Sequence, residues 1–278
     1  MILNKFYVDD LIKNALNEDI NYIDVAADYL IPEEQRNDSY FVSKADGVLC
    51  GIDIAMRVFS LLDDSFTYKL YKKDGDYVKN GDLIAEFNGK TTCLLKGERT
   101  ALNILQHMSG IATATNSAVK LCEGTKAQVT DTRKTLPMLR PIQKYAVTCG
   151  GGKNHRYNLS DGAMLKDNHI DACGGIENAV KLLRSKLGHM VKIEVETRNF
   201  NEVREAVNAG ADIIMLDNMT NEEMIHCVEY IDSRAKTEAS GNITLDNIAE
   251  KAKTGVDIIS LGALTHSVKA FDISMKMR

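Results

Sequence analysis

Residues 192–219 read KIEVETRNFNEVREAVNAGADIIMLDNM, and this stretch carries the pattern that decides the fold. Both of its ends are short apolar runs typical of strands. Between them, Phe200, Val203 and Val207 recur at helical spacing, and Gly210 fits the end of a helix. A strand, a helix and a second strand in this order predict two parallel strands, because the helix returns the chain to the edge where it started.

The same alternation runs through the rest of the chain from residue 127. Strand-like runs read QVTDT, GAMLKD, KIEVET, ADIIMLDN, KTEASG and VDIISLG, and helical patterns separate most of them. One helix opens with Thr220 and Glu223, which fit a capping box. The strands end in polar residues at steps of about 20 to 35, as in the βα units of a barrel. A doubly wound sheet is the alternative, but it would gather its chemical groups at one switch point.

The N-terminal part has a different character. An apolar stripe from Val8 to Leu16 predicts a helix, and residues 39–95 contain β-prone runs punctuated by Gly and Asp. These runs (YFVSKADGVLCGI, SFTYKLYKK, DLIAEF and KTTCLL) predict antiparallel strands, with IDIAMRVFSLL as a helix between them. From Gly97 a long helix is expected, irregular at Ser109-Gly110. The sequence therefore predicts an α+β domain followed by an α/β barrel.

Composition excludes several classes of protein. The chain has 278 residues, 44% of them hydrophobic, enough for one large or two modest domains. A net charge of −5 argues against nucleic-acid partners and polybasic membrane attachment. We expect no signal peptide and no membrane helix. Six scattered cysteines without metal spacing predict reduced thiols in the cytoplasm, with Cys149 as a buried bystander.

Polar residues follow nearly every predicted strand. If the barrel is correct, these residues converge on its C-terminal mouth, where barrel enzymes bind their substrates; solvated loops are the alternative. The strand ends supply Asp131, Thr132, Arg133, Lys134, Lys166, Asp167, Asn168, His169, Glu194, Glu196, Asp217, Asn218, Ser240, Gly241 and Gly262.

One window of the chain is strongly basic. Residues 131–166 hold seven basic and two acidic residues, a local balance of +5 in a chain whose total is −5. They flank a run of three glycines at 150–152, which permits close backbone approach. This contrast predicts a pocket for a multiply anionic ligand, with a solvated basic face as the alternative. The basic residues are Arg133, Lys134, Arg140, Lys144, Lys153, Arg156 and Lys166.

Two carboxylates and two small-residue turns complete the expected site. Strand alternation in KIEVET puts Lys192, Glu194 and Glu196 on one face, where Lys192 and Glu194 could form a structural pair. Glu196 and Asp217, at strand ends, are candidates for a sugar hydroxyl or Mg²⁺ and could stabilise positive charge on a sugar. The turns EASGN and SLGALTHS offer backbone N–H groups to a phosphate at Ser240, Gly241, Gly262 and Ala263; ordinary tight turns are the alternative.

Taken together, the motifs resemble those of the quinolinate phosphoribosyltransferase family. They are GERTALNILQHMSGIAT, DTRKTLPMLR, GGGKNHRYNLSDGAMLKDNHI, the IEVE strand, IMLDNM, EASGNITLDN and SLGALTHS, in one order from about residue 8 to the C-terminus. ALNEDINYIDVA also resembles the family, although Ala26 stands where Thr is more usual. The resemblance implies an N-terminal α/β sandwich over residues 1–105 and an incomplete seven-stranded α/β barrel over 106–267. The segment 268–278 is a candidate to pack on the first domain.

The resemblance also implies roles for individual residues. It implies a homodimer, or a higher oligomer built from it, in which Arg99 reaches the partner's active site. Catalytic roles fall to Lys134, Lys166, Glu196 and Asp217, and the last two would hold Mg²⁺ directly or through water. The substrate-binding residues would be Arg99, Thr132, Arg133, Lys134, His155, Arg156, Lys166, Glu196, Asp217, Ser240, Gly241, Asn242, Leu261, Gly262 and Ala263.

The implied reaction joins quinolinate to phosphoribosyl pyrophosphate with loss of carbon dioxide, in NAD biosynthesis. Two rivals remain: a phosphoribosyltransferase for nicotinate or another aromatic acid, and a non-catalytic sensor of a phosphoribosyl ligand. A biotinyl carrier is a third, weaker alternative. DGDYVKNGDLIAEFNG resembles a carrier hairpin, but Lys276, in a terminal Met-Lys-Met, lies far from it in the sequence. We expect no nucleic-acid or membrane partner.

Overall fold

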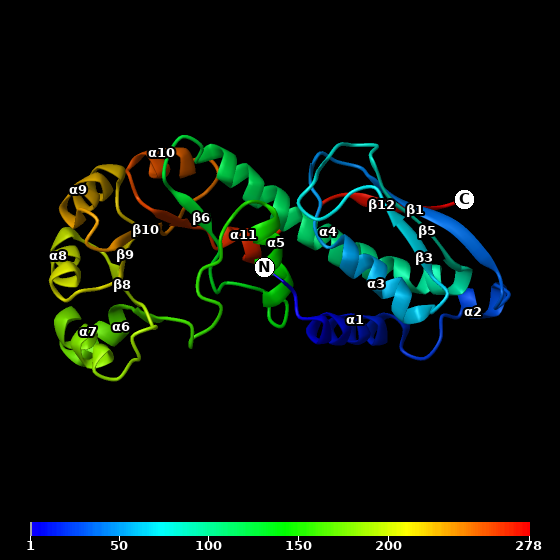
Figure 1. Cartoon of the computed structure of the whole chain (residues 1–278), viewed down its shortest axis with the longest axis horizontal. Helices are drawn as coiled ribbons and strands as arrows, with labels where there is room; N and C mark the ends of the chain where they lie inside the picture. Colours follow the sequence, from blue (N-terminus) through cyan, green and yellow to red (C-terminus); the bar gives the residue numbers. More distant parts are fainter. Residues whose placement is uncertain (1) are drawn as a thin grey trace. The chain divides into compact units, whose positions relative to one another are not determined.

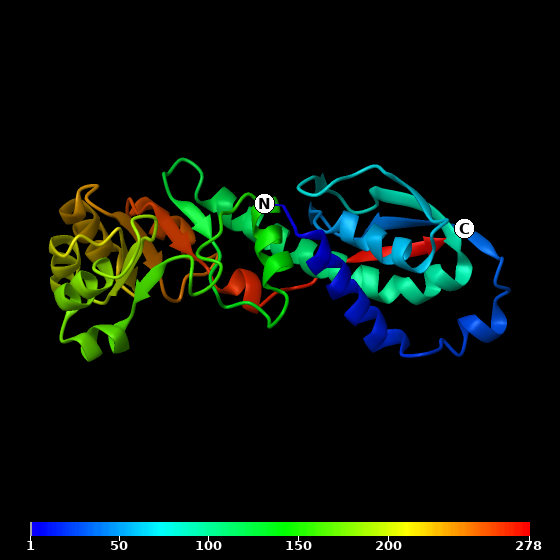
Figure 2. The ribbon, with the colours of Figure 1, turned by 60° about the horizontal axis from the view of Figure 1, so that its bottom comes forward.

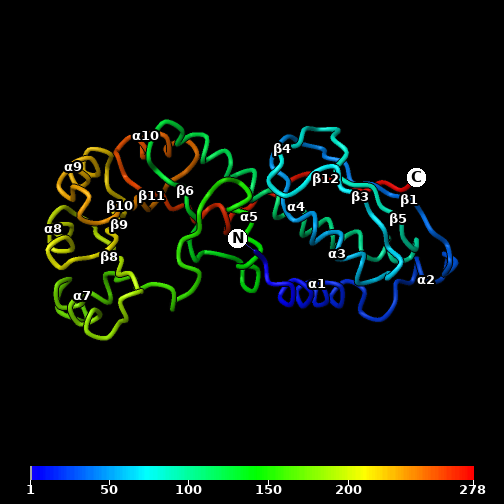
Figure 3. Tube along the Cα trace, in the orientation of Figure 1, coloured from blue at the N-terminus to red at the C-terminus, as the bar shows by residue number. Residues whose placement is uncertain are grey.

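The computed structural model describes residues 2–278 and divides into two compact units. The first unit runs to Asn116 and also includes Leu136–Gly151 and Ser267–Arg278. The second unit comprises Ser117–Thr135 and Gly152–His266. The elements of each unit can be followed in Figure 1 and along the Cα trace in Figure 3.

The second unit is built on one parallel sheet of six strands. The strand order is β6-β11-β10-β9-β8-β7, and every pair of neighbours is parallel. Helices α7 to α10 lie along the outer side of the strands (Figures 1 and 2). The elements are β6 (Gln128–Thr130), β7 (Ala163–Leu165), α6 (Asp167–Cys173), α7 (Ile176–Arg184), β8 (Ile193–Thr197), α8 (Phe200–Asn208), β9 (Ile213–Asp217), α9 (Asn221–Ile231), β10 (Lys236–Ser240), α10 (Ile248–Lys253), β11 (Ile258–Ser260) and α11 (Ala263–His266).

This arrangement confirms the predicted α/β barrel-like domain. Beyond β6, Lys153 makes a single parallel bridge to Thr130, at the edge where a seventh strand would lie. The three glycines at 150–152 directly precede it, and glycine is a poor strand former. The six-stranded sheet is therefore extended at this edge by one residue only.

The local signals of the sequence explain the helices of this unit. Asn199 caps α8 by accepting a hydrogen bond from the N–H of Glu202, and Val203 is buried on the inner face. Thr220 and Glu223 form the predicted capping box at the start of α9. Helices α8 and α9 are thus each fixed at the N-terminus by a side chain and held to the sheet by apolar burial.

Aspartates at the N-terminal ends of two strands accept hydrogen bonds from the neighbouring strand. Asp212, before β9, accepts a hydrogen bond of 2.8 Å from the N–H of Ile193 in β8. Asp257, before β11, accepts hydrogen bonds of 3.0 Å from both the N–H and the hydroxyl of Thr237 in β10. Because VDIISL repeats the pattern of ADIIML, the same fastening recurs two strands further along the sheet.

The first unit contains a four-stranded antiparallel sheet in the order β12-β1-β5-β3. Its aromatic centre joins Phe41 and Phe87 of the sheet, with ring centroids 5.0 Å apart, to Phe59 of α3. The elements are α1 (Lys5–Ile20), α2 (Ala27–Leu30), β1 (Arg36–Ser43), β2 (Gly47–Val48), α3 (Ile52–Leu62), β3 (Thr67–Leu70), β4 (Tyr77–Val78), β5 (Leu83–Lys90), α4 (Thr91–Leu121), α5 (Arg140–Cys149) and β12 (Ile273–Met277).

Two expectations for this unit were wrong. KTTCLL is not a strand, because α4 begins at Thr91, six residues before Gly97. The β-branched threonines favour a strand locally, but the helix buries Leu94 completely. The predicted irregularity at Ser109-Gly110 is absent too, since α4 continues through it. A Cβ on Gly110 would lie 2.2 Å from the carbonyl oxygen of Lys269, so this glycine admits the returning C-terminal segment.

No helix in the described part of the chain is both long and apolar enough to cross a bilayer.

We expect Asp257→Asn to destabilise the chain in a pH-dependent way. Burial raises the pKa of Asp257, but hydrogen bonds from Thr237 and two lysines outweigh burial and hold the pKa below the ordinary 3.8. The stabilisation is therefore fully present well above 3.8 and is lost as the pH falls through the folded-state pKa. Urea unfolding at neutral pH should show a loss of about 1.5–3 kcal/mol.

The deficit of this variant should shrink in acid, where the wild-type carboxylate is protonated as well. Asp246→Asn, at an exposed aspartate, is the matched control and should remain close to wild type at both pH values. A deficit that does not change with pH would show that the charge of Asp257 contributes nothing.

Candidate active site

The carboxyl ends of the parallel strands surround a cavity of about 440 Å³ in the second unit. This volume suits a small-molecule ligand. The cavity is lined by Thr132, Arg133, Lys134, His155, Arg156, Met164, Lys166, Glu196, Met215, Asp217, Asn218, Glu238, Ser240, Gly241, Asn242 and Ser260.

One part of the cavity wall carries two guanidinium groups close to each other. Burial lowers the pKa of Arg156, and the positive charge of Arg133 lowers it further. The Nη1 of Arg156 donates a 2.8 Å hydrogen bond to the carbonyl oxygen of Gly162, which fixes the side chain. Because two half-buried cations repel each other, an anion that binds between them is favoured.

His155 lies against two buried carboxylates. Its Nε2 is 3.2 Å from an oxygen of Glu194 and 3.4 Å from one of Glu238. Burial lowers the pKa of His155, but the contacts with both carboxylates outweigh it and raise the pKa to about 10. The N–H of Arg156 donates to Nδ1 at 2.7 Å, which favours the neutral ring. In either state Nε2 carries a proton that faces the carboxylates, so the ring has one orientation.

Asp131 positions His155 through its backbone. Its carboxylate is completely buried at the end of β6. It accepts hydrogen bonds from the N–H of His155 at 2.9 Å and from the side-chain amide of Asn154 at 2.6 Å. A buried charge needs such donors, so Asp131 holds the segment that follows the glycine run against the strand end.

The other wall of the cavity carries carboxylates. Glu196, near the end of β8, forms an ion pair with Lys166. Asp217, the last residue of β9, accepts a 2.7 Å hydrogen bond from the side-chain amide of Asn218. Anionic and cationic groups therefore line one cavity. Such a cavity can bind an anionic ligand and also stabilise positive charge that develops during a reaction.

Two glycines shape the rim. Gly241 has φ +89°, and a Cβ there would lie 2.3 Å from Oδ1 of Asn218. The side-chain amide of Asn242 donates to that same Oδ1 at 2.9 Å. A Cβ on Gly262 would come within 3.0 Å of Cδ of Lys134, so the lysine stem lies directly on this glycine.

Comparison with known proteins identifies the family. Family models described as the N-terminal and C-terminal domains of quinolinate phosphoribosyl transferase match residues 24–109 and 111–276. The chain belongs to the quinolinate phosphoribosyltransferase family. A probable nicotinate-nucleotide pyrophosphorylase (carboxylating) from Bacillus subtilis is 46% identical and aligns over 98% of this chain and 94% of that protein. One of the same name from Methanocaldococcus jannaschii is 42% identical over 98% and 97%.

Solved structures agree with this assignment. The crystal structure of NadC from Streptococcus pyogenes has a TM-score of 0.96 and 42% identity to this chain, covering 99% of this chain and 98% of that one. The nicotinate-nucleotide pyrophosphorylase from Francisella tularensis has a TM-score of 0.95 and 38% identity, over 100% and 98%. The family fold thus extends over nearly the whole chain.

The structure brings most of the predicted site residues together. Of the predicted substrate-binding residues, those outside the cavity lining are Arg99, exposed on α4 in the first unit, and Leu261, Gly262 and Ala263 at or just before the start of α11. The predicted strand-end residues Asp131, Asp167, Asn168, His169 and Glu194 do not line the cavity either. The residues that line the cavity are Thr132, Arg133, Lys134, His155, Arg156, Lys166, Glu196, Asp217, Ser240, Gly241 and Asn242.

The basic window is divided by the fold. Arg140 and Lys144 belong to α5 in the first unit, and Lys153 does not line the cavity. The suggested pair of Lys192 with Glu194 is wrong, because Lys192 lies 3.1 Å from Asp212. Glu194 points inward and contacts His155 instead.

Sequence reasoning missed Glu238, which contacts His155 and is 1% exposed. A signal was present, since Glu238 lies two residues before Ser240 and therefore on the same face of β10. Met164, Met215 and Ser260 also line the cavity without having been singled out.

Gly241→Ala should destabilise the second unit. Alanine is strained at φ +89°, and its Cβ would displace Asn218, which bonds Asp217. We expect a loss of about 1–3 kcal/mol in urea unfolding. Gly188→Ala is the matched control, because a Cβ there meets nothing within 4 Å, and it should change stability by less than about 0.5 kcal/mol. Equal stability of the two variants would contradict the strain at Gly241.

Proposed function

We propose that the cavity at the strand ends is the active site at which this chain transfers the phosphoribosyl group of phosphoribosyl pyrophosphate to quinolinate. The reaction releases pyrophosphate and carbon dioxide and gives nicotinate mononucleotide, a step of NAD biosynthesis. One observation carries this assignment: a single cavity combines a cluster of cations with two carboxylates on neighbouring strands. The cations suit a dicarboxylate, and the carboxylates suit a sugar that develops positive charge.

Quinolinate fits the cationic wall. Its two carboxylates would be held by Arg133, Arg156 and Lys166, with His155 lining the same wall and the guanidiniums able to bind both oxygens of a carboxylate at once. A substrate with one carboxylate, such as nicotinate, would leave part of this charge uncompensated. A non-catalytic sensor would have no need of Glu196 and Asp217. The quinolinate reaction therefore accounts for more of the cavity than either rival.

The chemistry needs no covalent enzyme intermediate. The pyridine nitrogen attacks the anomeric carbon of the ribose while pyrophosphate departs from its opposite face. Glu196 and Asp217 stabilise the oxocarbenium character of the sugar, and Lys134 faces the leaving pyrophosphate. The resulting pyridinium accepts the electron pair of the breaking bond to the 2-carboxylate. Carbon dioxide leaves, and a proton replaces it on the ring.

The remaining predicted residues would hold the 5′-phosphate. Ser240, Gly241 and Asn242 line the cavity, and Gly262 lies against Lys134. Thr132 accepts a 2.9 Å hydrogen bond from the N–H of Lys134 and so shapes the turn that carries the lysine. Turns without bulky side chains allow a phosphate to approach backbone N–H groups.

Mg²⁺ fits this donor set. It prefers oxygen ligands and commonly binds through one or two carboxylates together with substrate phosphates and water. Glu196 and Asp217 line the same cavity and supply carboxylate oxygens, so they would hold the ion directly or through water. When bound, it would neutralise charge on the pyrophosphate.

We also propose a homodimer with shared sites and a cytoplasmic location. Arg99 is exposed on α4 and is free to reach a partner subunit, and the resemblance places it in the partner's quinolinate site. All six cysteines are free thiols, which suits a reducing compartment. Some plant relatives carry "mitochondrial" or "chloroplastic" in their names, so location varies within the family.

A substrate comparison tests the reaction. With Mg²⁺ and phosphoribosyl pyrophosphate, the purified chain should convert quinolinate to equal amounts of carbon dioxide and nicotinate mononucleotide, and nicotinate should give no product. Asp217→Asn should lower kcat roughly 10²-fold with little change in quinolinate binding, because its role is at the transition state. Product from nicotinate, or full turnover by the variant, would overturn this part of the proposal.

Subunit mixing tests the shared site. Arg99→Ala and Lys166→Ala should each be nearly inactive, because each removes a charge that contacts quinolinate. After random exchange half the dimers are mixed, and each has one site with both lesions and one intact site. Activity should return to roughly a quarter of wild type. Each variant exchanged with itself is the control; confirmed exchange without recovery would place Arg99 in its own subunit's site.

A further inference from the structure

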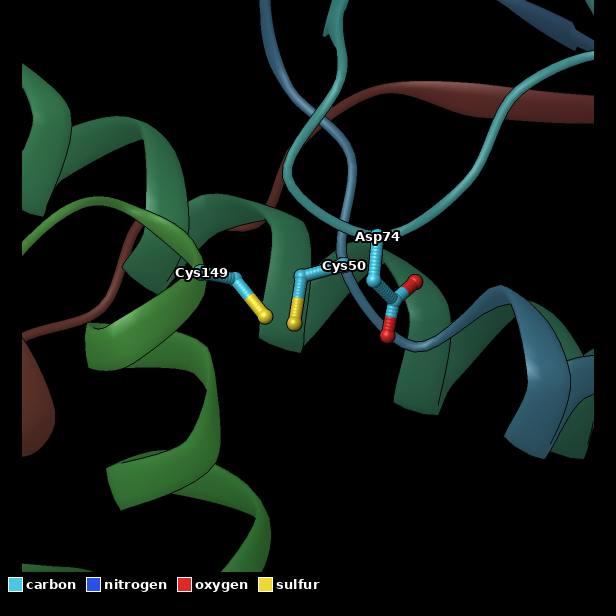
Figure 4. Close-up of side chains that lie close together, drawn as sticks. All are labelled: Cys50, Asp74 and Cys149. Carbon is cyan, nitrogen blue, oxygen red and sulfur yellow. The ribbon is translucent and has the colours of Figure 1, made fainter. Parts of the chain in front are cut away.

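A second group of chemically active side chains lies in the first unit, outside the cavity assigned to the reaction. Cys50 lies between β2 and α3, and Asp74 lies in the turn between β3 and β4. Cys149 is the last residue of α5. One ligand atom from each, the two sulfurs and a carboxylate oxygen, all lie within 4.8 Å of one another. Figure 4 shows the two sulfur atoms facing each other, with the carboxylate of Asp74 on the side of Cys50.

The group is held rigidly by hydrogen bonds. Oδ1 of Asp74 accepts from the N–H groups of Gly51 and Ile52, at 2.8 and 3.0 Å. Its Oδ2 accepts from the hydroxyl of Tyr145 in α5, at 3.0 Å. The N–H of Cys50 donates to the hydroxyl of Ser109 at 2.9 Å. The ligand atoms are therefore positioned before any ligand arrives, which reduces the entropy lost on binding.

The thiols are in different environments. Burial raises the pKa of Cys50, which is completely enclosed. The pKa of Cys149 is lowered, chiefly because the Cys50 thiol donates a hydrogen bond to it. Cys149 is also partly exposed, so the pair offers one accessible sulfur.

The group can be reached from solvent. A cavity of about 590 Å³ in the first unit is lined by Asp74 and Tyr145, together with residues of α1 and α3. Its wall contains three acidic and two basic side chains, so it does not repel a cation. The cavity therefore gives a ligand access to the side chain of Asp74, one of the three residues of the group.

We propose that Cys50, Asp74 and Cys149 bind a thiophilic divalent cation of the zinc type. Two sulfurs and a carboxylate oxygen are ligands that zinc accepts, with water from the cavity in the fourth position. At zinc distances of roughly 2.0–2.3 Å, tetrahedral ligand atoms lie about 3.5–3.8 Å apart, so ligand atoms that all lie within 4.8 Å of one another would draw together by at most about 1 Å. A hard cation such as Mg²⁺ would not select sulfur, which separates this site from the one at Glu196 and Asp217.

Binding would join three segments of the first unit. The ligands come from the start of α3, from the β3–β4 turn and from α5, which the chain reaches only after passing through part of the second unit. The ion would therefore tie α5 to the rest of this unit. It would raise the thermal unfolding temperature, because a cation bound only by the folded state shifts the equilibrium toward it.

Cobalt(II) provides a direct probe. The full-length chain, reduced and stripped of metal by a chelator, is titrated with Co²⁺ while the near-ultraviolet absorption of thiolate-to-cobalt charge transfer is followed. We expect one equivalent per chain to give this band and Zn²⁺ to abolish it. Co²⁺ held by carboxylates elsewhere gives no thiolate band, so failure here is distinguishable from failure of the reaction assignment.

Variants assign the band to this site. Cys149→Ser should lose about half of the absorption and weaken binding at least about tenfold, because one of two thiolates is gone. Cys50→Ser combined with Cys149→Ser should show none. Cys122→Ser and Cys227→Ser, at buried thiols elsewhere, are the matched controls and should keep the full band. The proposal is overturned if the reduced wild type gives no band, or if the band survives in the double variant.

Wild-type protein also separates binding from oxidation. If Cys50 and Cys149 are oxidised to a disulfide with each other, while oxidised glutathione is reduced to two molecules of glutathione thiol, the chain should lose cobalt binding, and reduction should restore it. Restoration supports the same pair of thiols as ligands.

Discussion

The parallel register of the second unit's strands is the constraint on which the candidate site depends. Ser240 pairs directly with Asp217, and Ser260 pairs with Thr130, so strand ends that are distant in sequence lie side by side. A shift of one residue in any strand would turn its polar end away from the cavity. The aspartates at the opposite ends of the strands hold this register, because each accepts a hydrogen bond from the neighbouring strand.

Buried carboxylates partly balance the positive charge of the cavity. Arg133 and Arg156 line the ligand space, and the buried carboxylates of Glu194 and Glu238 contact His155 beside them. The carboxylates offset some of the positive charge that would otherwise be costly to gather in one place. The cations can therefore stay close together without a ligand, and their attraction for a dianion is retained.

Local patterns predicted the parts of the fold that local forces decide. Helix α8 and the capping box of α9 are set by residues within a few positions of each other, and both were confirmed. The start of α4 and the role of Gly110 depend on contacts with distant segments, such as Lys269, which no short window contains. Strand-end chemistry was predictable because parallel strands share one edge. The partner of Glu194 was not, because His155 comes from a loop.

The pairing of β12 with β1 sets the order in which the chain can be assembled. These last residues form the edge of the first unit's sheet, with Met275 opposite Phe41. The C-terminal segment is translated after every residue of the second unit. On a ribosome, the domain that begins first therefore finishes last, and until then β1 has an open edge. A nascent chain would need to keep that edge from pairing with a neighbour, so the synthesis of β12 bears directly on solubility during translation.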